Sequence, residues 1–371
     1  MEMKRTGVLI TGPSLRDPGG VANYYNAVLP FLETDDRLDV QYLEIGSTHG
    51  NSGILHPLSD QMSFRRALRQ FSPDVVHVNP SLTVKSFFRD GLIVRHARRL
   101  GLPVMVFFRG WDEAMEAKVD GYLGRYFRAT YAHADIFVVL ASRFRQKLIQ
   151  WGVSSPICIG TTTVPDKLLD GFSIADKASD IKQSSAKRIL FMARLEKKKG
   201  VIETVEAAAS LLREGLPISL TISGDGPAIA EVRQFVAGLD VPKGSIEFTG
   251  YVAGQQKREI LMAHHVYCFP SEYAEGMPNS VLEAMAFGMP IITAAVGGLA
   301  DFFEDGRMGY LVDGRNVAQI GEKIRKLVNN REATARMAEY NHCYAKARFL
   351  ASDVAENLGT MYCGIARKGM D

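Results

Sequence analysis

The sequence has 371 residues, of which 46% are hydrophobic, and a formal net charge of +3. A chain of this length is too long for one ordinary core and is typical of two domains of roughly 150 to 200 residues each. The small net charge does not indicate nucleic-acid binding, which requires positive charge concentrated over one face. The four cysteines lie far apart without a C-x-x-C pair, a pattern typical of free thiols in a reducing compartment rather than of a disulfide framework or a metal cluster.

No stretch of the sequence approaches the roughly 20 apolar residues that a membrane-spanning helix needs. Residues 1–5 lead directly into a short apolar run. We therefore expect a cytoplasmic protein, or one that is held peripherally at the inner face of the membrane.

The first half of the chain alternates short apolar runs with helical segments. The first run, residues 7–10, is followed by a loop that ends in Gly19 and Gly20, and then by an apolar helix. Two adjacent glycines before a helix let a ligand approach the backbone, although a tight turn explains the pair equally well. Such alternation is typical of a parallel doubly wound sheet, so we predict a Rossmann-like domain over residues 1–170. Its further strands are predicted at residues 40–43, 75–78, 104–108 and 136–140.

The second half of the chain repeats this organisation. The segment from about residue 171 to 186 is polar and rich in Ser, Asp and Lys, which predicts a linker. A second Rossmann-like domain is predicted over residues 187–350, and apolar residues at helical spacing predict a terminal helix within 351–371. The sequence leaves open whether this helix packs on its own domain or back on the first. The strands of the second domain are predicted at residues 188–192, 218–222, 246–248, 266–269 and 289–292.

Charged residues and glycines follow successive strands of the second domain. They would lie at the sheet edge where open α/β folds bind ligands. Arg194 and Lys199 follow the first strand, and their cationic side chains suit a diphosphate. Their neighbour Lys198 is interpreted as a solvated side chain. Gly224 lies in a glycine turn after the second strand, and Tyr251 follows the third.

The fourth strand leads into the segment 275–290, which places two carboxylates around the start of a helix. Glu275 is predicted in the loop and Glu283 one or two turns into the helix, and Pro278 suits the first helical turn. Free amides at the helix N-terminus would bind an anion such as a phosphate, while the carboxylates would bind sugar hydroxyls. The segment therefore predicts a sugar-nucleotide site.

Four motifs in this order resemble the family 4 retaining glycosyltransferases of the GT-B fold. They are the glycine pair, R-x-x-x-x-K-G over residues 194–200, G-x-G-P over 224–227, and E-G-x-P-x-x-x-x-x-E-A-M-A-x-G-x-P over 275–290. The resemblance covers most of the chain. It implies two tandem Rossmann-like domains that face each other across a cleft. It also implies transfer of a sugar, from a UDP-sugar as the expected donor, with retention of the anomeric configuration and without a metal.

The resemblance further implies roles for individual residues. Arg194 and Lys199 would bind the diphosphate and Glu283 the ribose hydroxyls. Glu275 would lie beside the transferred sugar and is, with Arg194 and Lys199, an expected catalytic residue. The donor would be bound by Gly19, Gly20, Arg194, Lys199, Gly224, Tyr251, Glu275, Gly276, Met277, Pro278, Asn279 and Glu283.

One position departs from the family pattern. After the strand at 104–108 the family usually has a histidine close to the donor sugar, and this chain has Arg109. A guanidinium stays charged and cannot act as a neutral imidazole. In one interpretation Arg109 binds a carboxylate or phosphate on the donor or the acceptor. In the other it helps to hold the diphosphate or pairs with Asp112. We count Arg109 among the expected catalytic residues. His77 is a second candidate for this role, but we favour a structural histidine there, as for His264 and His265.

Basic charge is concentrated in residues 61–100, which contain eight Lys or Arg side chains and two Asp. Aromatic and aliphatic residues are interleaved with them. Such helices would contact an anionic membrane surface, where each cation contributes about 1 kcal/mol. A solvated helix face whose apolar side lies in the core explains the pattern equally well.

We therefore predict a metal-independent hexosyl- or related glycosyltransferase of surface polysaccharide or glycolipid synthesis. Its partners would be a nucleotide-sugar donor and a glycan or lipid-linked acceptor, with no cofactor and no nucleic acid. Two alternatives remain: a sugar-nucleotide epimerase built on the same architecture, and a catalytically silent sugar-nucleotide-binding protein. The sequence does not specify the sugar, the base, the acceptor or the linkage.

Overall fold

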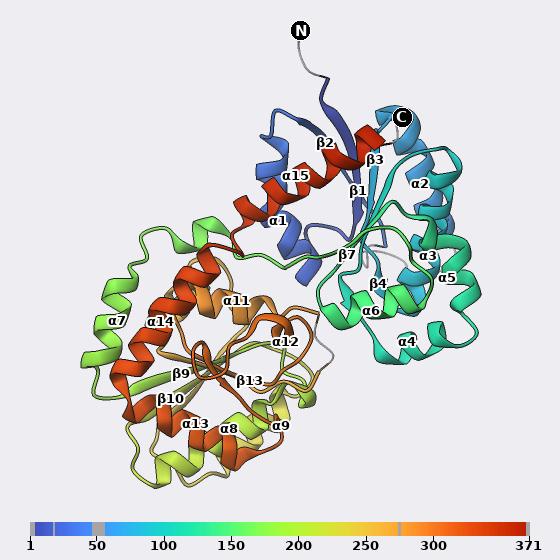
Figure 1. The fold of residues 1–371 in the computed structure, drawn as a ribbon. Coiled ribbons are helices and arrows are strands. Elements are labelled where there is room, and N and C mark those ends of the chain that lie inside the picture. The colour runs from blue at the N-terminus through green and yellow to red at the C-terminus, as the bar shows by residue number, and fades with distance from the viewer. Residues whose placement is uncertain (1–3, 18, 47–55, 274–275, 369–371) are drawn as a thin grey trace. The chain divides into compact units, whose positions relative to one another are not determined.

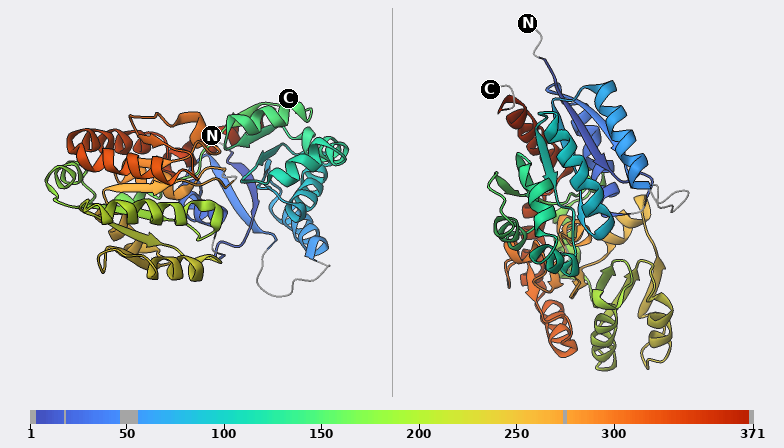
Figure 2. Two further views of the ribbon diagram at one scale, coloured as in Figure 1. Left: turned by 90° about the horizontal axis from the view of Figure 1, so that it is seen from below. Right: turned by 90° about the vertical axis from the view of Figure 1, so that its right-hand side faces the viewer.

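The computed structural model describes residues 4–17, 19–46, 56–273 and 276–368 (Figure 1). The chain divides into two compact units. Unit 1 comprises Met1–Thr163, Ala274–Met277 and Ala351–Asp371, and unit 2 comprises Val164–Tyr273 and Pro278–Leu350. Each unit is built on a parallel sheet with helices on both of its faces, which confirms the predicted fold class (Figure 2).

The sheet of unit 1 is short, apolar and parallel. All four residues of its central strands at 75–78, 104–107 and 136–139 are buried, as expected where helices cover both faces of a parallel sheet. The strands of unit 1 are β1 (Thr6–Gly12), β2 (Leu38–Glu44), β3 (Val75–Val78), β4 (Ser81–Leu82), β5 (Val104–Phe107), β6 (Gly110–Trp111), β7 (Ile136–Val139) and β8 (Ile157–Ile159). The order in the main sheet is β2-β1-β3-β5-β7-β8, and β4 pairs separately with β6.

The helices of unit 1 come from both ends of the chain. They are α1 (Gly20–Glu33), α2 (His56–Phe71), α3 (Val84–Arg99), α4 (Glu113–Asp120), α5 (Gly124–Thr130), η1 (Tyr131–His133), α6 (Ser142–Gln150) and α15 (Ala351–Lys368). Helix α15 lies alongside α1, drawn in red and blue in Figure 1. At its inner face the Tyr362 hydroxyl shares a hydrogen bond of 2.6 Å with Nδ1 of His77. Burial lowers the pKa of His77 to about 3, so its ring is neutral at pH 7 and has a structural environment.

The sheet of unit 2 is also parallel, with the order β11-β10-β9-β12-β13-β14. The last predicted strand, at 289–292, is displaced: it begins at Ile291 because Pro290 has no amide hydrogen for the strand ladder. The strands of unit 2 are β9 (Lys187–Met192), β10 (Ile218–Ser223), β11 (Ile246–Gly250), β12 (Val266–Phe269), β13 (Ile291–Thr293) and β14 (Gly309–Leu311).

Unit 2 contains one helix where the sequence predicted a linker. Residues 174–183 of the expected linker at 171–186 form α7, whose N-terminus is capped by the Ser173 hydroxyl. The helices of unit 2 are η2 (Asp166–Leu169), α7 (Ile174–Gln183), η3 (Lys197–Lys199), α8 (Val201–Arg213), α9 (Ile229–Ala237), α10 (Gly254–Ala263), α11 (Asn279–Ala286), α12 (Leu299–Phe302), α13 (Val317–Asn329) and α14 (Arg331–Lys346).

Helix α7 is held by a small apolar contact and one buried lysine. Ala178 and Ile181 pack against two alanines of α14. On the same helix, Lys177 is 4% exposed, and its Nζ donates to the carbonyls of Leu261, at 3.2 Å, and Met262, at 2.7 Å, and to that of His264. The linker prediction was wrong because the segment has few apolar residues among many polar ones, so its sequence gives little indication that it packs as a helix.

Across the described ranges, none of the helices has the length and apolar character needed to span a bilayer.

Candidate functional site

The strand order of unit 2 reverses between β9 and β12. After β9 the chain continues to β10 and β11 on one side, whereas β12 is followed by β13 and β14 on the other. In open parallel sheets, ligands bind at the carboxyl ends of the strands beside such a reversal. The segments that follow β9 and β12 therefore form the candidate site, and they contain most of the predicted residues.

Lys199 lies beside this reversal. Its Nζ is 4.3 Å from the ring centroid of Tyr273, which follows β12. The next residue, Gly200, has φ +79°, and an added Cβ would lie 2.6 Å from the carbonyl oxygen of Pro270. Only glycine allows this approach, so the turn that contains Lys199 packs directly against the end of β12.

Arg194 follows β9 by two residues and is much more exposed. Its Nε lies 3.2 Å from Oε1 of Glu196, and 71% of its side chain is accessible to solvent. An exposed pair of this kind contributes little and leaves the guanidinium mobile enough to reorient. Both predicted cations thus lie in the loop after β9, with Lys199 the more firmly placed.

Helix α11 begins next to the end of β12. Pro278 is its N-cap, with φ −74° and ψ 111°, and Asn279 is its first residue. Pro278 therefore lies one position earlier than the predicted first helical turn, where its carbonyl accepts a hydrogen bond from Val281, at 3.1 Å. Because proline has no side-chain oxygen, no side chain caps the helix, and the amides of Asn279 and Ser280 have no partner within the helix. Glu275 lies outside the described residues.

The other two residues of this segment, Gly276 and Met277, are grouped with unit 1. The carbonyl of Met277 accepts a hydrogen bond of 3.5 Å from the Thr162 hydroxyl. An added Cβ at Gly276 would come within 2.9 Å of Cδ1 of Leu140, so a larger residue here would require the Leu140 side chain to move.

Glu283 is buried in α11 and paired with a lysine that the sequence did not single out. Its Oε1 lies 2.5 Å from Nζ of Lys257 on α10, and the two side chains are 5% and 22% exposed. A carboxylate that is so buried needs a cation or several donors. The need of a buried carboxylate for a cation was the only indication in the sequence that Glu283 has a basic partner. The sequence alone could not specify that this partner is Lys257.

Replacing Lys257 by methionine is expected to weaken nucleotide binding by about 10-fold or more, because it leaves the Glu283 carboxylate without the cation that orients it. We expect a larger change in KM than in kcat, since the resemblance implies that Glu283 binds the ribose rather than the transferred sugar. Lys257→Arg should retain most of the affinity. The exposed Lys243 provides the matched control as Lys243→Met, and equal affinities of the two methionine variants would contradict the role of Lys257.

Gly224, a predicted donor-binding residue, has a role within the chain. Its φ is +137°, and an added Cβ would lie 1.9 Å from the carbonyl oxygen of Ala193. Gly226 approaches the carbonyl of Leu195 in the same way, at 2.5 Å. Packing between two strand-end loops therefore accounts for both glycines without a ligand. Tyr251, just after β11, is 66% exposed.

The strand order of unit 1 reverses between β1 and β3, so its own sheet edge resembles that of unit 2. Gly19 and Gly20 lie there at the start of α1, and a Cβ added to either would meet nothing within 4 Å. Arg109 lies at the same edge after β5, with its guanidinium 3.8 Å from the ring centroid of Tyr24. The suggested pairing with Asp112 is not present among the described residues, because Asp112 caps α4 by accepting from the amide of Met115, at 2.9 Å.

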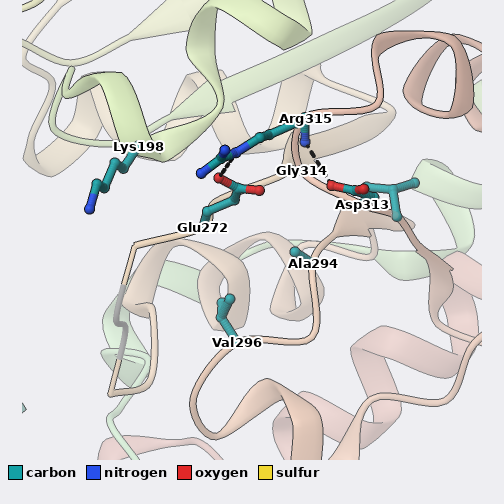
Figure 3. A pocket seen from close by; sticks show the side chains of 8 residues that line it. Lys198, Glu272, Ala294, Val296, Asp313, Gly314 and Arg315 are labelled. Carbon is teal, nitrogen blue, oxygen red and sulfur yellow. Dashed lines mark hydrogen bonds and ion pairs between the residues drawn. The ribbon is translucent and has the colours of Figure 1, made fainter. Parts of the chain in front are cut away.

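A cavity of about 420 Å³ lies at the carboxyl ends of β12, β13 and β14 in unit 2 (Figure 3). Inside it, Nε of Arg315 is 2.5 Å from Oε2 of Glu272. An added Cβ at Gly314 would lie 2.5 Å from the carbonyl of Pro270, so this wall too packs against the end of β12. The sequence prediction did not include this cavity, which is lined by Lys198, Glu272, Ala294, Val296, Val312, Asp313, Gly314 and Arg315.

Two protein-family models match the chain, one in each unit. The Glycosyl transferase 4-like domain matches residues 8–159, and Glycosyl transferases group 1 matches residues 174–342. Together with the two parallel sheets, these matches support a glycosyltransferase of the GT-B fold.

Individual relatives agree with this class. An alpha-D-kanosaminyltransferase of Streptomyces kanamyceticus is 26% identical over 174 residues, which are 47% of this chain and 45% of the relative. A GDP-mannose-dependent alpha-(1-6)-phosphatidylinositol monomannoside mannosyltransferase of Mycobacterium tuberculosis is 27% identical over 186 residues, 47% of each protein. The chain spans about half the length of the curated relatives it matches. The structure of HepE from Anabaena, in complex with UDP and glucose, superimposes with a TM-score of 0.71 at 15% identity and covers 95% of this chain and 98% of its own.

Proposed function

We propose that the chain is a retaining glycosyltransferase that moves a hexose or related sugar from a nucleotide-diphosphate sugar to an acceptor hydroxyl. UDP is the expected nucleotide and a surface glycan or glycolipid the expected product. The observation that carries the proposal is the convergence at one strand reversal of unit 2: the Lys199 turn, the uncapped start of α11 and the buried Glu283–Lys257 pair. Such a site offers cations and amides for a diphosphate next to a carboxylate for ribose.

The chemistry follows from these groups. During transfer, the bond between the anomeric carbon and the diphosphate oxygen breaks, and the acceptor hydroxyl oxygen bonds to that carbon on the same face. The hydroxyl proton leaves with the diphosphate. Lys199 and Arg194 would stabilise the negative charge that develops on the leaving group, so we propose that no metal is required. Glu275 would lie beside the sugar, as the resemblance implies.

Thermal unfolding with a panel of ligands tests the proposal. UDP, GDP, UDP-glucose, UDP-galactose and GDP-mannose should be compared, since a ligand at 100 times its Kd adds about 2.7 kcal/mol of stability. The relatives include a GDP-mannose-dependent enzyme, so the base is part of the question. No stabilisation by any of them would contradict the proposal. Release of free nucleotide would indicate the transferase, interconversion of the sugar an epimerase, and neither reaction a silent binding protein. EDTA should leave the turnover unchanged.

We also propose that residues 61–100 contact an anionic membrane surface. On α3, Phe88 and Leu92 are 38% and 44% exposed, and they share a helix face with the exposed Arg95 and Arg99. Other apolar residues of the segment, such as Phe87, are fully buried in the core. Flotation with liposomes of increasing anionic-lipid content tests this contact, and binding that does not depend on anionic lipid would contradict it.

A further inference from the structure

Arg109 is a buried cation that has no ion pair among the described residues. It is 8% exposed, and its Nε and Nη1 atoms are buried with no hydrogen-bond partner among the described residues. Its guanidinium carbon lies 3.8 Å from the ring centroid of Tyr24 and 4.3 Å from that of Phe107. The side chain therefore lies against two aromatic rings that are nearly perpendicular to each other, at 89°, with no carboxylate paired to it in the described part of the chain.

The backbone of Arg109 is fixed in place. Its amide donates to the carbonyl of Pro80, at 2.9 Å, and the following residues form β6, which pairs with β4. An added Cβ at Gly110 would lie 3.1 Å from the Ser81 hydroxyl, so the two short strands are in close contact. The position of the guanidinium at the edge of the unit 1 sheet is thus built into the fold.

A partly buried arginine of unit 1, Arg89, shows how the chain compensates such a charge elsewhere. Arg89 is 17% exposed in its side chain, and it forms two parallel hydrogen bonds to the carboxylate of Asp90, from Nε at 2.6 Å and from Nη2 at 2.9 Å. The Asp90 carboxylate compensates the charge of Arg89, and it also accepts a hydrogen bond from the Ser86 hydroxyl. Arg109 has the same burial requirement without such a carboxylate.

The described residues next to Arg109 do not supply negative charge. Burial raises the pKa of Tyr24 to about 12, and burial together with Arg109 itself lowers the pKa of His77 to about 3, so both side chains are neutral at pH 7. The first turn of α1, at the same edge, contains no acidic residue. Stacking on aromatic rings offsets only a small part of the cost of burying an unpaired ion. An anion from outside the chain would complete this site.

We propose that Arg109 recognises an anionic group, a carboxylate or a phosphoryl group, on the transferred sugar or on the acceptor. The start of α1 with its open Gly19 and Gly20 lies at the same sheet edge and adds amides at a positive helix end. A guanidinium forms paired hydrogen bonds with either anion, whereas a neutral hydroxyl would leave the buried charge uncompensated. This proposal rests on the proposed transferase function and names the class of its substrate.

Calorimetric titration of the full chain tests the site in two arms. The donor arm compares UDP-glucuronate with UDP-glucose. The acceptor arm compares glucuronate and glucose 6-phosphate with glucose, both with saturating UDP and without it. In one arm the anionic ligand should bind at least about 10-fold more tightly than its neutral counterpart, as expected for a buried charge-assisted hydrogen bond. Arg109→Met should reduce this preference to about two-fold or less, and Arg109→Lys should retain part of it.

Arg98, which pairs with Asp135 at 2.7 Å, provides a control as Arg98→Met, and this variant should keep the full preference. Without ligand, Arg109→Met should unfold at the same temperature as the wild type or higher, because it removes an unpaired buried charge. A marked destabilisation would identify a structural cation and overturn the proposal. The proposal would also be overturned if the anionic and neutral ligands bound with equal affinity in both arms, or if the preference for the anionic ligand survived in Arg109→Met. If UDP and UDP-sugars fail to bind at all, the transferase proposal fails, and the acceptor arm without UDP still tests Arg109.

Discussion

Replacing Lys199 by methionine is expected to lower kcat/KM for the nucleotide-sugar donor by about 100-fold or more, the usual effect of removing one preorganised group that stabilises developing charge. The Lys199 turn packs against the end of β12 through Gly200, so the ammonium group is held beside the strand reversal. Initial rates of nucleotide release at several donor concentrations measure the effect. Both kcat and kcat/KM should fall, since the charge on the diphosphate is largest in the transition state.

The adjacent Lys198 makes the control unusually close. It lies in the same helical turn, is exposed, and lines the cavity at the carboxyl end of β12. Lys198→Met should keep kcat/KM within about two-fold of the wild type, as a screened surface charge does. Stability should change by less than about 1 kcal/mol in Lys199→Met, because its contact with Tyr273 is a cation–π contact of modest energy. Equal loss of activity in both variants would show that only the overall charge of the loop matters.

Lys177→Met is expected to destabilise unit 2 by about 3 kcal/mol, because it leaves the carbonyls at the end of α10 buried without a donor. The matched control on the same helix is Lys182→Met, whose pair with Glu332 is largely exposed and should contribute about 0–1 kcal/mol. Trp111 and Trp151, the two tryptophans of the chain, both lie in unit 1. Urea unfolding followed by circular dichroism should therefore show the effect of Lys177→Met, while tryptophan fluorescence follows unit 1.

The effect of Lys177 should also depend on pH. Burial lowers the pKa of Lys177 to about 7 from its ordinary value of 10.5. Between these values the unfolded chain binds more protons than the folded one, so stability from this group rises with pH, by up to about 1.4 kcal/mol per pH unit. The difference between wild type and Lys177→Met should therefore grow from pH 7 to pH 9. A difference that is constant or falls over this range would show that the buried amine keeps its proton.

Much of the fold could be predicted from the sequence because buried parallel strands are continuous apolar runs. The strands around Val76, Val106 and Val138 carry this signal without ambiguity, and their alternation with helices determines the class. Helix α7 was missed for the opposite reason. Its stability depends on Lys177, whose partners lie more than 80 residues later in the chain, and no local pattern in the sequence contains that information.

The candidate site was predicted unevenly. Strand ends could be located, so Arg194 and Lys199 could be assigned to one edge of the sheet. The partner of Glu283 could not, because Lys257 lies on another helix and only the packing of α10 and α11 brings the two together. For Gly224 the predicted contact with the donor stays a prediction, and the structure adds a second reason for glycine, its approach to the carbonyl of Ala193, which the sequence could not show. That Arg109 has no ion pair among the described residues is likewise visible only in three dimensions.

The position of α15 has a consequence for the order in which the protein takes shape during synthesis. Unit 1 begins with β1 but needs α15, which covers α1 and brings the Tyr362 hydroxyl to His77. All of unit 2, Val164–Tyr273 and Pro278–Leu350, is translated between these two parts. Unit 2 is therefore translated in full once residue 350 has been made, whereas β1 and α1 remain without the cover of α15 until residues 351–368 follow.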